Sequence, residues 1–399
     1  MIAIPWYFVD SLEAPGLFGI IYFCVNLISI FWGPYAGTLV DKYNRKHLFL
    51  AENVFGATIF LSTAAYGFAL GSLPTALVIL CFAATFFVYN IHYPTLFAFA
   101  QEIIEEKYYG KISTWLEIQG QFTSMISGAI AAVLLSGVIQ GPTSFLGLNI
   151  NIPFSIEAWP LHKIFLMDGI TYTISFLLIS LMTFVPTVIR NREKGNVIKQ
   201  FKIGINFLKK NPMIFVFGNA AYFIFVTIMI ANFMILPTHI STTLNGSGNE
   251  FATCEIFYSI GALTAGLSVR YLFKRTTTVK GNIILTLLGA FTLLGIGITS
   301  KIWMVYILLL FLALSNSGSR IMRVIYLFNH VPNQVIGRTQ SVFQFINIAF
   351  RLTFIGIFSL AFFTERTYLD FYVLAIFAFI AAAILIYYRD RIENIKIKM

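Results

Sequence analysis

The chain has 399 residues, of which 58% are hydrophobic and 11% carry a charge. Soluble proteins carry about 25% charged residues, so the composition excludes an ordinary soluble domain and indicates a surface that contacts lipid. The net charge is +10, but the basic residues fall in short clusters between long apolar runs. That distribution is typical of membrane topology signals and argues against a nucleic-acid-binding face.

The chain opens with a short apolar piece, residues 1–9, followed by Asp10 and Glu13. This piece is too short to span a bilayer and lacks the basic start of a signal peptide. We interpret it as the second half of a first transmembrane helix that is truncated in this chain. Counting that helix, the sequence predicts twelve.

Eleven further apolar runs are long enough to cross a membrane. They lie near residues 16–39, 48–70, 74–99, 113–138, 161–187, 213–237, 251–273, 282–299, 303–328, 340–363 and 370–388. Most Lys and Arg residues fall in every second loop and in the C-terminal tail. The positive-inside rule therefore predicts that these loops and the C-terminus are cytoplasmic.

The longest basic loop, residues 190–212, divides the chain into an N-terminal transmembrane half, 1–189, and a C-terminal transmembrane half, 213–399. Within this linker, Val197, Phe201, Ile205 and Leu208 recur at helical spacing. We expect an amphipathic helix there, lying along the inner surface of the membrane.

One motif closes the second helix and contains Gly33, Gly37, Asp41, Arg45 and Lys46. The two glycines share a helix face and allow another helix to approach closely. Asp41 is an acid in a basic loop, where it can neutralise the positive N-terminus of a neighbouring helix. Arg45 and Lys46 can pair with acids or carbonyl groups on the same face.

The pattern Gly37-x-x-x-Asp41-Lys-x-x-Arg45-Lys46 resembles the loop 2–3 signature of the major facilitator superfamily. Asn44 stands where that family usually has glycine, and Asn also tolerates a left-handed backbone. The resemblance implies an all-α bundle of twelve helices in two six-helix halves around a central cavity. It also implies that the motif acts as a cytoplasmic gate, that the protein is a monomer, and that it is a secondary transporter.

Two other segments, residues 165–176 and 331–341, resemble the exporter branch that includes macrolide and siderophore efflux permeases. This resemblance implies export of a small molecule from a bacterial cell across its inner membrane, driven by the proton gradient. An uptake permease for a nutrient or metabolite, and a non-transporting or degraded membrane protein, remain as alternatives.

Ionisable residues inside the predicted helices are candidates for substrate binding or ion coupling, because a charge in lipid is costly. The candidates are Arg351, Arg320, Asp168 and Glu117. Glu52, Glu117 and Arg323 lie nearer to helix ends, and we expect them to reach the interface or to join the gate network.

The fourth and fifth helices carry two further patterns. Asn90 and His92 lie near the middle of the fourth helix, where His92 either carries a proton or packs as a hydrogen-bonded residue. Gly120, Ser124 and Gly128 form a stripe of small residues on the fifth helix, suited to helix packing, gating or both.

Enzyme motifs are absent from the sequence, including a phosphate-binding loop, H-E-x-x-H, G-x-S-x-G and Cys-x-x-Cys. The three cysteines have no metal-ligand spacing. We therefore expect a transporter with no enzymatic activity, cofactor or metal site, whose partners are a small-molecule substrate and the lipid bilayer.

Overall fold

The computed structural model describes residues 3–103, 109–137, 141–145, 148–152, 155–183 and 197–395. The first part of the chain forms α1 (Ala3–Trp6), the π-helix η1 (Tyr7–Ser11), α2 (Pro15–Lys42), α3 (Arg45–Leu70), α4 (Thr75–Ile103), α5 (Tyr109–Ser136) and α6 (Leu161–Leu181). A short antiparallel hairpin of β1 (Gly141–Phe145) and β2 (Leu148–Ile152), which the sequence analysis did not predict, lies between α5 and α6.

The second part begins with α7 (Val197–Lys210), followed by one continuous helical segment. This segment consists of α8 (Pro212–Ile230), η3 (Ala231–Ile235), α9 (Leu236–Thr238) and η4 (His239–Thr243). The remaining helices are α10 (Gly248–Leu272), α11 (Thr278–Ile298), α12 (Ile302–His330), α13 (Asn333–Phe358), α14 (Ala361–Thr364), α15 (Thr367–Tyr387) and α16 (Arg389–Glu393).

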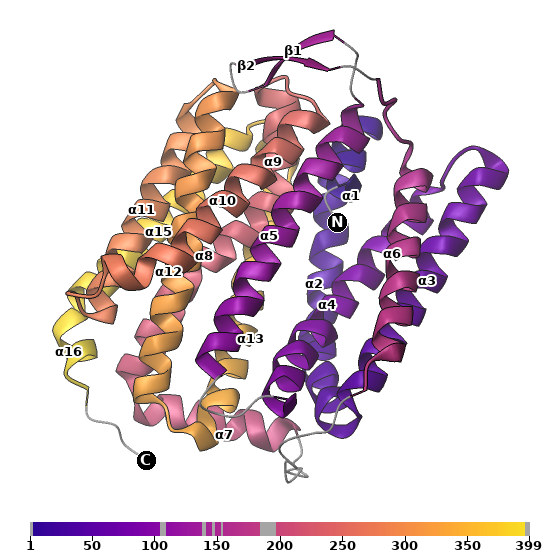
Figure 1. Ribbon diagram of the computed structural model, residues 1–399. Coiled ribbons are helices and arrows are strands. Elements are labelled where there is room, and N and C mark those ends of the chain that lie inside the picture. Colours follow the sequence, from indigo (N-terminus) through magenta and orange to yellow (C-terminus); the bar gives the residue numbers. More distant parts are fainter. Residues whose placement is uncertain are drawn as a thin grey trace.

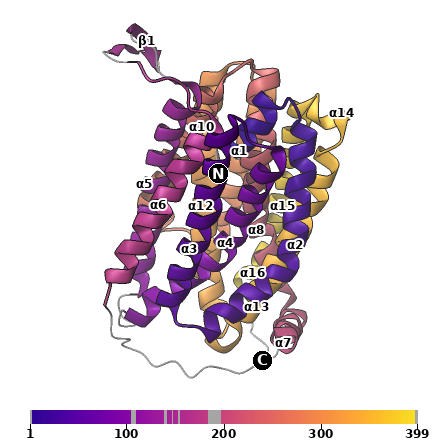
Figure 2. The ribbon, with the colours of Figure 1, turned by 90° about the vertical axis from the view of Figure 1, so that its right-hand side faces the viewer.

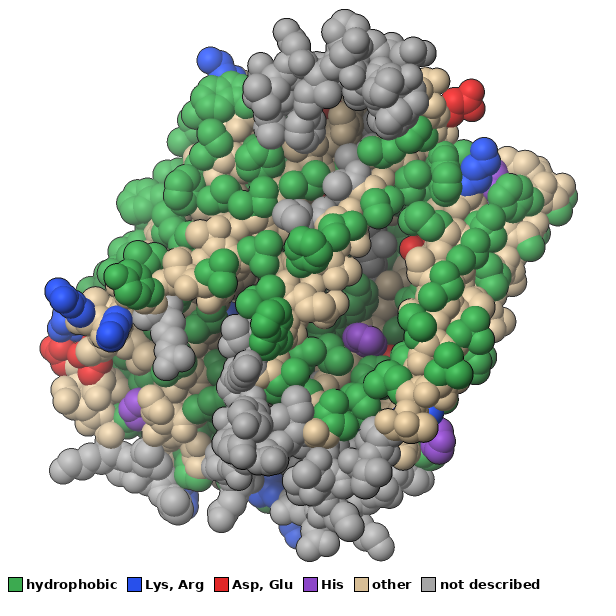
Figure 3. All heavy atoms as spheres, in the orientation of Figure 1, with side chains coloured by type: hydrophobic (Ala, Val, Ile, Leu, Met, Phe, Trp, Pro, Cys, Tyr) green, Lys and Arg blue, Asp and Glu red, His purple; other side chains and the backbone are tan. Residues whose placement is uncertain are grey.

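The expected membrane spans are confirmed within the described residues, where eleven helical segments are long and apolar enough to cross a bilayer. Charged side chains lie mainly near the two ends of the bundle on the face shown in Figure 3, with hydrophobic ones between them. This distribution suits helices whose outer faces contact lipid and whose ends meet water.

The helix boundaries follow from local signals. Asn44 caps α3 by accepting a hydrogen bond from the backbone N–H of Lys46 at 2.9 Å. Its φ of −66° is extended, so the left-handed interpretation of Asn44 was wrong: the side chain serves as an N-cap. Gly71 ends the same helix with a φ of +74°, which glycine adopts without steric cost. Ser247 and Glu250 form a capping box that starts α10.

The bundle has two halves, which confirms the predicted fold class (Figure 1). In the first half α3 packs against α6 and α4 packs against α2 and α3; in the second, α12 packs against α10 and α11, and α11 against α15. Contacts of α2 with α13, and of α5 with α10, join the two halves. Helix α7 lies across one end of the bundle and the hairpin projects at the other (Figures 1 and 2). These ends are called the α7 end and the hairpin end below.

Helix α7 is amphipathic, as its spacing predicted. Phe207 and Leu208 are buried, and Gly204 contacts the backbone of Arg338 near the start of α13. The lysines of its last turn, Lys209 and Lys210, are exposed. The helix therefore fastens to the second half with its apolar face.

Candidate functional site

The contact between α2 and α13 differs between its two ends. Gly19 and Gly33 lie on the same face of α2. A methyl group on Gly19 would lie 2.8 Å from Cε of Met234 and 3.0 Å from Cβ of Ser359, whereas a methyl group on Gly33 would have no atom of the described residues within 4 Å. The halves therefore touch along α2 at the hairpin end and stand apart toward the α7 end. Gly37, one turn further along the motif, lies outside the residues whose surroundings are described.

The contact between α5 and α10 has the same asymmetry. Within the stripe of Gly120, Ser124 and Gly128, a methyl group on Gly128 would lie 3.2 Å from Cβ of Glu255 in α10. A methyl group on Gly248, at the start of α10, would lie 3.1 Å from a side chain of α5. At Gly120, nearer the α7 end, such a methyl group would have no atom within 4 Å in the part of the chain that the structure describes. Both contacts thus describe a bundle that is closed at the hairpin end and open at the α7 end.

The remaining motif residues lie at the α7 end of the first half. Lys46 donates hydrogen bonds to the carbonyl groups of Ser180 at 2.9 Å and Met182 at 2.7 Å, at the end of α6. A cation there stabilises the negative C-terminal end of the helix, so this lysine joins two helices of one half. Arg45 is buried. The side chain of Asp41 lies outside the described residues.

A carboxylate and an imidazole meet inside the first half. Nδ1 of His92 in α4 lies 3.1 Å from Oε2 of Glu52 in α3. The side chain of Glu52 is 6% exposed and that of His92 is 41% exposed. Glu52 therefore does not reach the interface, which was one of its two expected positions; it turns inward and pairs with His92.

The groups around this pair come from α3, α4 and α6. The rings of Phe49 and Tyr93 lie 5.5 Å and 5.7 Å from that of His92. The phenol of Tyr172, in α6, interacts electrostatically with Glu52 and with Asp168, which lies one turn earlier on α6. The face of the molecule shown in Figure 3 is hollowed between α5 and α6.

A second polar cluster lies where α2 meets α13. Arg351 of α13 is 7% exposed, and no described residue forms a hydrogen bond with Nε of its guanidinium. The guanidinium interacts with the hydroxyl of Tyr22 in α2, which donates a hydrogen bond to the carbonyl of Met229 at 2.9 Å. Asn347 and Asn26, one turn away on their respective helices, are also buried. Because α13 begins earlier than predicted, Arg351 lies nearer the hairpin end than the sequence suggested.

The structure also shows the positions of the other candidates. Asn90 donates a hydrogen bond to the carbonyl of Phe86 in its own helix at 3.0 Å. Asp168 is half-buried on α6, and Arg320 is half-buried on α12. The side chain of Glu117 lies outside the described residues.

Arg323 does not reach a helix end, contrary to expectation. It is 3% exposed, donates a hydrogen bond to the carbonyl of Ala221 at 3.1 Å and covers the ring of Tyr222 with its guanidinium 3.7 Å from the centroid. This arginine therefore fastens α12 to α8 within the second half.

Sequence reasoning missed three ionisable groups inside the spans. Glu255 faces Gly128 across the contact between the halves. His239 and Asp370 are buried in the second half, where Nδ1 of His239 lies 2.8 Å from Oγ1 of Thr367. Glu255 lies inside a predicted apolar run, Asp370 is the first residue of another, and His239 lies two residues beyond a third. A search for ionisable residues both inside the runs and at their ends would have found them.

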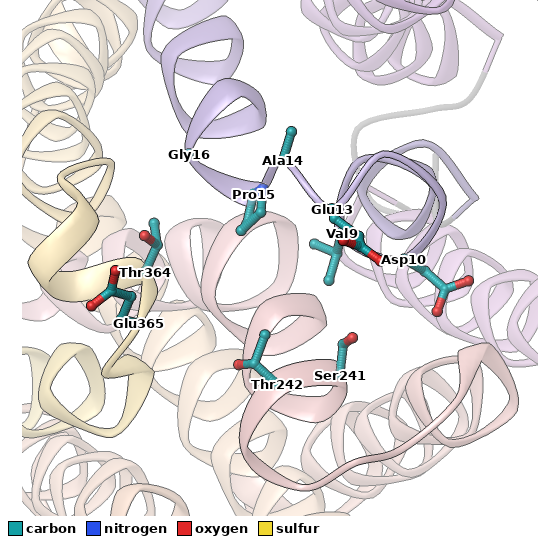
Figure 4. Close-up of a pocket in the computed structure, with 10 residues that line it drawn as sticks. All are labelled: Val9, Asp10, Glu13, Ala14, Pro15, Gly16, Ser241, Thr242, Thr364 and Glu365. Atoms are coloured by element: carbon teal, nitrogen blue, oxygen red, sulfur yellow. The ribbon is translucent and has the colours of Figure 1, made fainter.

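A surface cavity of about 730 Å³ opens at the hairpin end. The connection between η1 and α2, η4 and α14 form its walls (Figure 4). Asp10, Glu13 and Glu365 contribute its carboxylates, and Ser241 and Thr242 its hydroxyl groups. Among the described residues, no group of three or more His, Cys, Asp or Glu side chains is placed to hold a metal ion.

Comparison with solved structures finds transporters of the same fold. A bacterial homologue of the human lysosomal transporter Spinster, inward-facing and unoccupied, is 12% identical, with 96% of this chain and 92% of that chain covered and a TM-score of 0.66. The nucleoside transporter NupG is 11% identical, covering 98% and 94%, with a TM-score of 0.63. A bacterial homologue of the iron transporter ferroportin, outward-facing, is 14% identical, covering 98% and 96%, with a TM-score of 0.58.

A search of curated proteins gave no match. The sequence matches the family model of the Major Facilitator Superfamily over residues 1–352, which is most of the chain. Together with the two-halved helical bundle, this match supports a secondary transporter rather than an enzyme. The chain belongs to the Major Facilitator Superfamily.

Proposed function

We propose that this protein exports a small solute across a bacterial inner membrane by alternating access, driven by the proton gradient. The observation that carries the proton coupling is the contact between Glu52 and His92 inside two membrane spans. The basic loops at the α7 end support a cytoplasmic position for this end by the positive-inside rule. In that orientation the structure corresponds to a state open to the cytoplasm.

The chemistry of this pair suits a proton carrier. A carboxylate within a membrane is costly unless it is paired or protonated, and a histidine changes its charge near neutral pH. Because His92 is 41% exposed while Glu52 is buried, the imidazole can exchange a proton with water in the open side of the protein. Protonation of the pair changes the charge that is buried between α3 and α4. The proton gradient can therefore shift the equilibrium between the state open at the α7 end and the state open at the hairpin end.

A route for the proton runs through the first half. Asp168 lies toward the hairpin end of α6, and Tyr172 one turn further interacts with both Asp168 and Glu52. Glu52 in turn contacts His92. We propose that a proton passes along these four groups between the two ends of the bundle, while the solute occupies the contact between the halves.

The direction of transport rests on the resemblance of residues 165–176 and 331–341 to exporters. The state open at the α7 end is compatible with either direction, since both kinds of transporter visit it. The direction therefore has to be measured together with the coupling.

The test is an accumulation assay in cells that lack their main efflux pumps. Dyes, macrolides and siderophores are screened with and without a proton uncoupler. We expect reduced accumulation of at least one compound, abolished by the uncoupler and by Glu52→Gln or His92→Gln. Glu365→Gln, an exposed acid at the hairpin end, is the matched control and should keep the activity.

Two outcomes would contradict this proposal. Increased accumulation that needs the protein would establish uptake instead of export. Export that persists with the uncoupler and in the Glu52 and His92 variants would exclude this pair as the coupling site.

A further inference from the structure

Arg351 is a buried cation for which the described residues provide no acid partner. It is 7% exposed, and within the part of the chain that the structure describes no carboxylate oxygen forms an ion pair with it. Arg323, another buried arginine of the second half, donates a hydrogen bond from Nη1 to a backbone carbonyl and lies over an aromatic ring, although its Nε also has no partner among the described residues. An unpaired guanidinium inside a membrane protein is costly and is usually functional.

The polar groups next to Arg351 are also incompletely satisfied. Nδ2 of Asn347, one turn earlier on α13, is buried and has no hydrogen-bond partner among the described residues. Within the same residues Nε of Arg351 also has none. On α2, Asn26 donates from Nδ2 to the carbonyl of Tyr22 at 2.8 Å, but its buried Oδ1 accepts nothing. Buried polar groups in proteins normally have partners, so three orphaned atoms in one place indicate that a ligand completes the cluster.

These residues come from both halves of the protein. The two helices run antiparallel, with Gly19 beside Ser359 and Tyr22 beside Arg351, so Asn26 and Asn347 lie at a similar depth. The cluster lies just inside the closed hairpin end, where the halves still touch. A ligand held there contacts each half at the place where they must separate for the other side to open.

The unsatisfied donors define the chemistry of that ligand. A guanidinium presents a planar fork of N–H donors that matches the oxygens of a carboxylate, phosphate or sulfonate. The amide N–H of Asn347 adds another donor, and Oδ1 of Asn26 can accept a hydrogen bond from a hydroxyl or ammonium group of the same molecule. A cation or a neutral apolar solute would leave the guanidinium unpaired.

We propose that Arg351 and Asn347 bind the acid group of a small organic anion, that Asn26 accepts a hydrogen bond from another group of the same molecule, and that such an anion is the transported solute. This proposal rests on the transport function proposed above. The ion pair is formed by the solute, so the empty transporter carries an unpaired charge at the junction of its halves. Binding of the anion neutralises this charge and permits the halves to rock.

The experiment measures binding without a proton gradient, on the full chain purified in detergent. A small-molecule extract of cells is separated on an anion exchanger, and the retained acidic fraction is compared with the unretained fraction. We expect the acidic fraction to raise the melting temperature of the wild-type protein by roughly 2–5 °C, as a ligand near saturation does. The unretained fraction should leave it unchanged.

Variants assign the effect to the cluster. Arg351→Gln should abolish the shift, Arg351→Lys should reduce it because the fork is lost, and Asn347→Ala should reduce it as well. Arg323→Lys alters a buried arginine that has its own partners and should keep the full shift. If Arg351→Gln does not fold, the lysine and Asn347 variants still decide the question.

The proposal is overturned if the unretained fraction stabilises the protein instead, if neither fraction does, or if the acidic fraction stabilises the Arg351 variants fully. Because no gradient is present, these results do not depend on the Glu52 and His92 pair. Loss of proton coupling with intact anion binding would overturn only the proposed function, and coupled transport without anion preference would overturn only this inference.

Discussion

Gly19 offers a direct way to shift the balance between the two states of the bundle. In Gly19→Ala, the added methyl group would meet Cβ of Ser359 at 3.0 Å and Cε of Met234 at 2.8 Å. The methionine end can move, but the serine Cβ is fixed to α13. Overpacking of this kind costs about 1–3 kcal/mol, and we expect about 1–2 kcal/mol here. The state closed at the hairpin end should therefore lose about 5- to 30-fold in population.

Gly33→Ala is the matched variant on the same face of α2. Its methyl group meets no atom within 4 Å in the present state, so it should leave this state unstrained. It should disfavour the state in which the α7 ends of α2 and α13 approach each other. The two single-methyl changes therefore have opposite expected effects.

Spin labels measure these populations by pulsed electron resonance, after the three native cysteines have been replaced. One label pair, His47→Cys and Lys280→Cys, spans the two halves at the α7 end, and another, Leu70→Cys and Ile298→Cys, spans them at the hairpin end; all four positions are exposed. Gly19→Ala should shorten the first distance and lengthen the second. The reasoning is refuted if both distances stay unchanged, or if Gly33→Ala has the same effect as Gly19→Ala.

Three other changes have expected outcomes. Lys46→Ala removes two hydrogen bonds to the last carbonyls of α6 and should lower the unfolding free energy by about 1–2 kcal/mol, measured by thermal unfolding against Lys163→Ala. Trp6→Ala removes a ring that is stacked on Phe251 with 5.7 Å between the ring centroids. Cysteines introduced at the hairpin end should then react faster with thiol reagents. Unchanged reaction rates would show that Trp6 does not help to close the hairpin end. Gly261→Ala places a methyl group against the backbone of Leu310 and should cost at least about 2 kcal/mol in thermal unfolding, whereas Gly266→Ala, in open space, should cost less than about 1 kcal/mol.

The spans and the fold could be predicted because a lipid environment requires long apolar runs, which are visible in the sequence itself. Runs of about 20 apolar residues must be helices, since the bilayer leaves no other partner for backbone N–H and C=O groups. The spacing of Phe201, Ile205 and Leu208 likewise predicted α7. The hairpin after α5 was missed because its residues alternate only briefly and lie outside the apolar runs.

The candidate site could be predicted only in part, because its geometry depends on which helices meet. Arg351 was recognised from its depth, but its neighbours on α2 lie more than 300 residues away in sequence, and no local pattern connects them. Glu52 and His92 were each noticed, yet their contact depends on how α3 rotates against α4. His239 and Asp370 were missed because both sit at predicted span ends.

The asymmetry of the glycine contacts is a property that the sequence alone does not encode. Gly19 and Gly33, or Gly128 and Gly120, are equivalent as residues on a helix face, and both suit close packing. Only the three-dimensional arrangement distinguishes the packed member of each pair from the open one. The states of a transporter are different packings of the same sequence, so a structure is needed to determine which of them is present.

The most direct test of proton-coupled transport is proton movement itself. The purified chain is reconstituted in liposomes that contain a pH-sensitive dye, and the acidic small-molecule fraction that stabilises the protein is added outside without a pH gradient. The account predicts a proton flux that depends on this fraction and is lost in Glu52→Gln. Movement of the solute is measured in parallel in liposomes that contain the wild-type protein and in liposomes that contain the variant. Solute movement without any proton flux in the wild-type protein would contradict it.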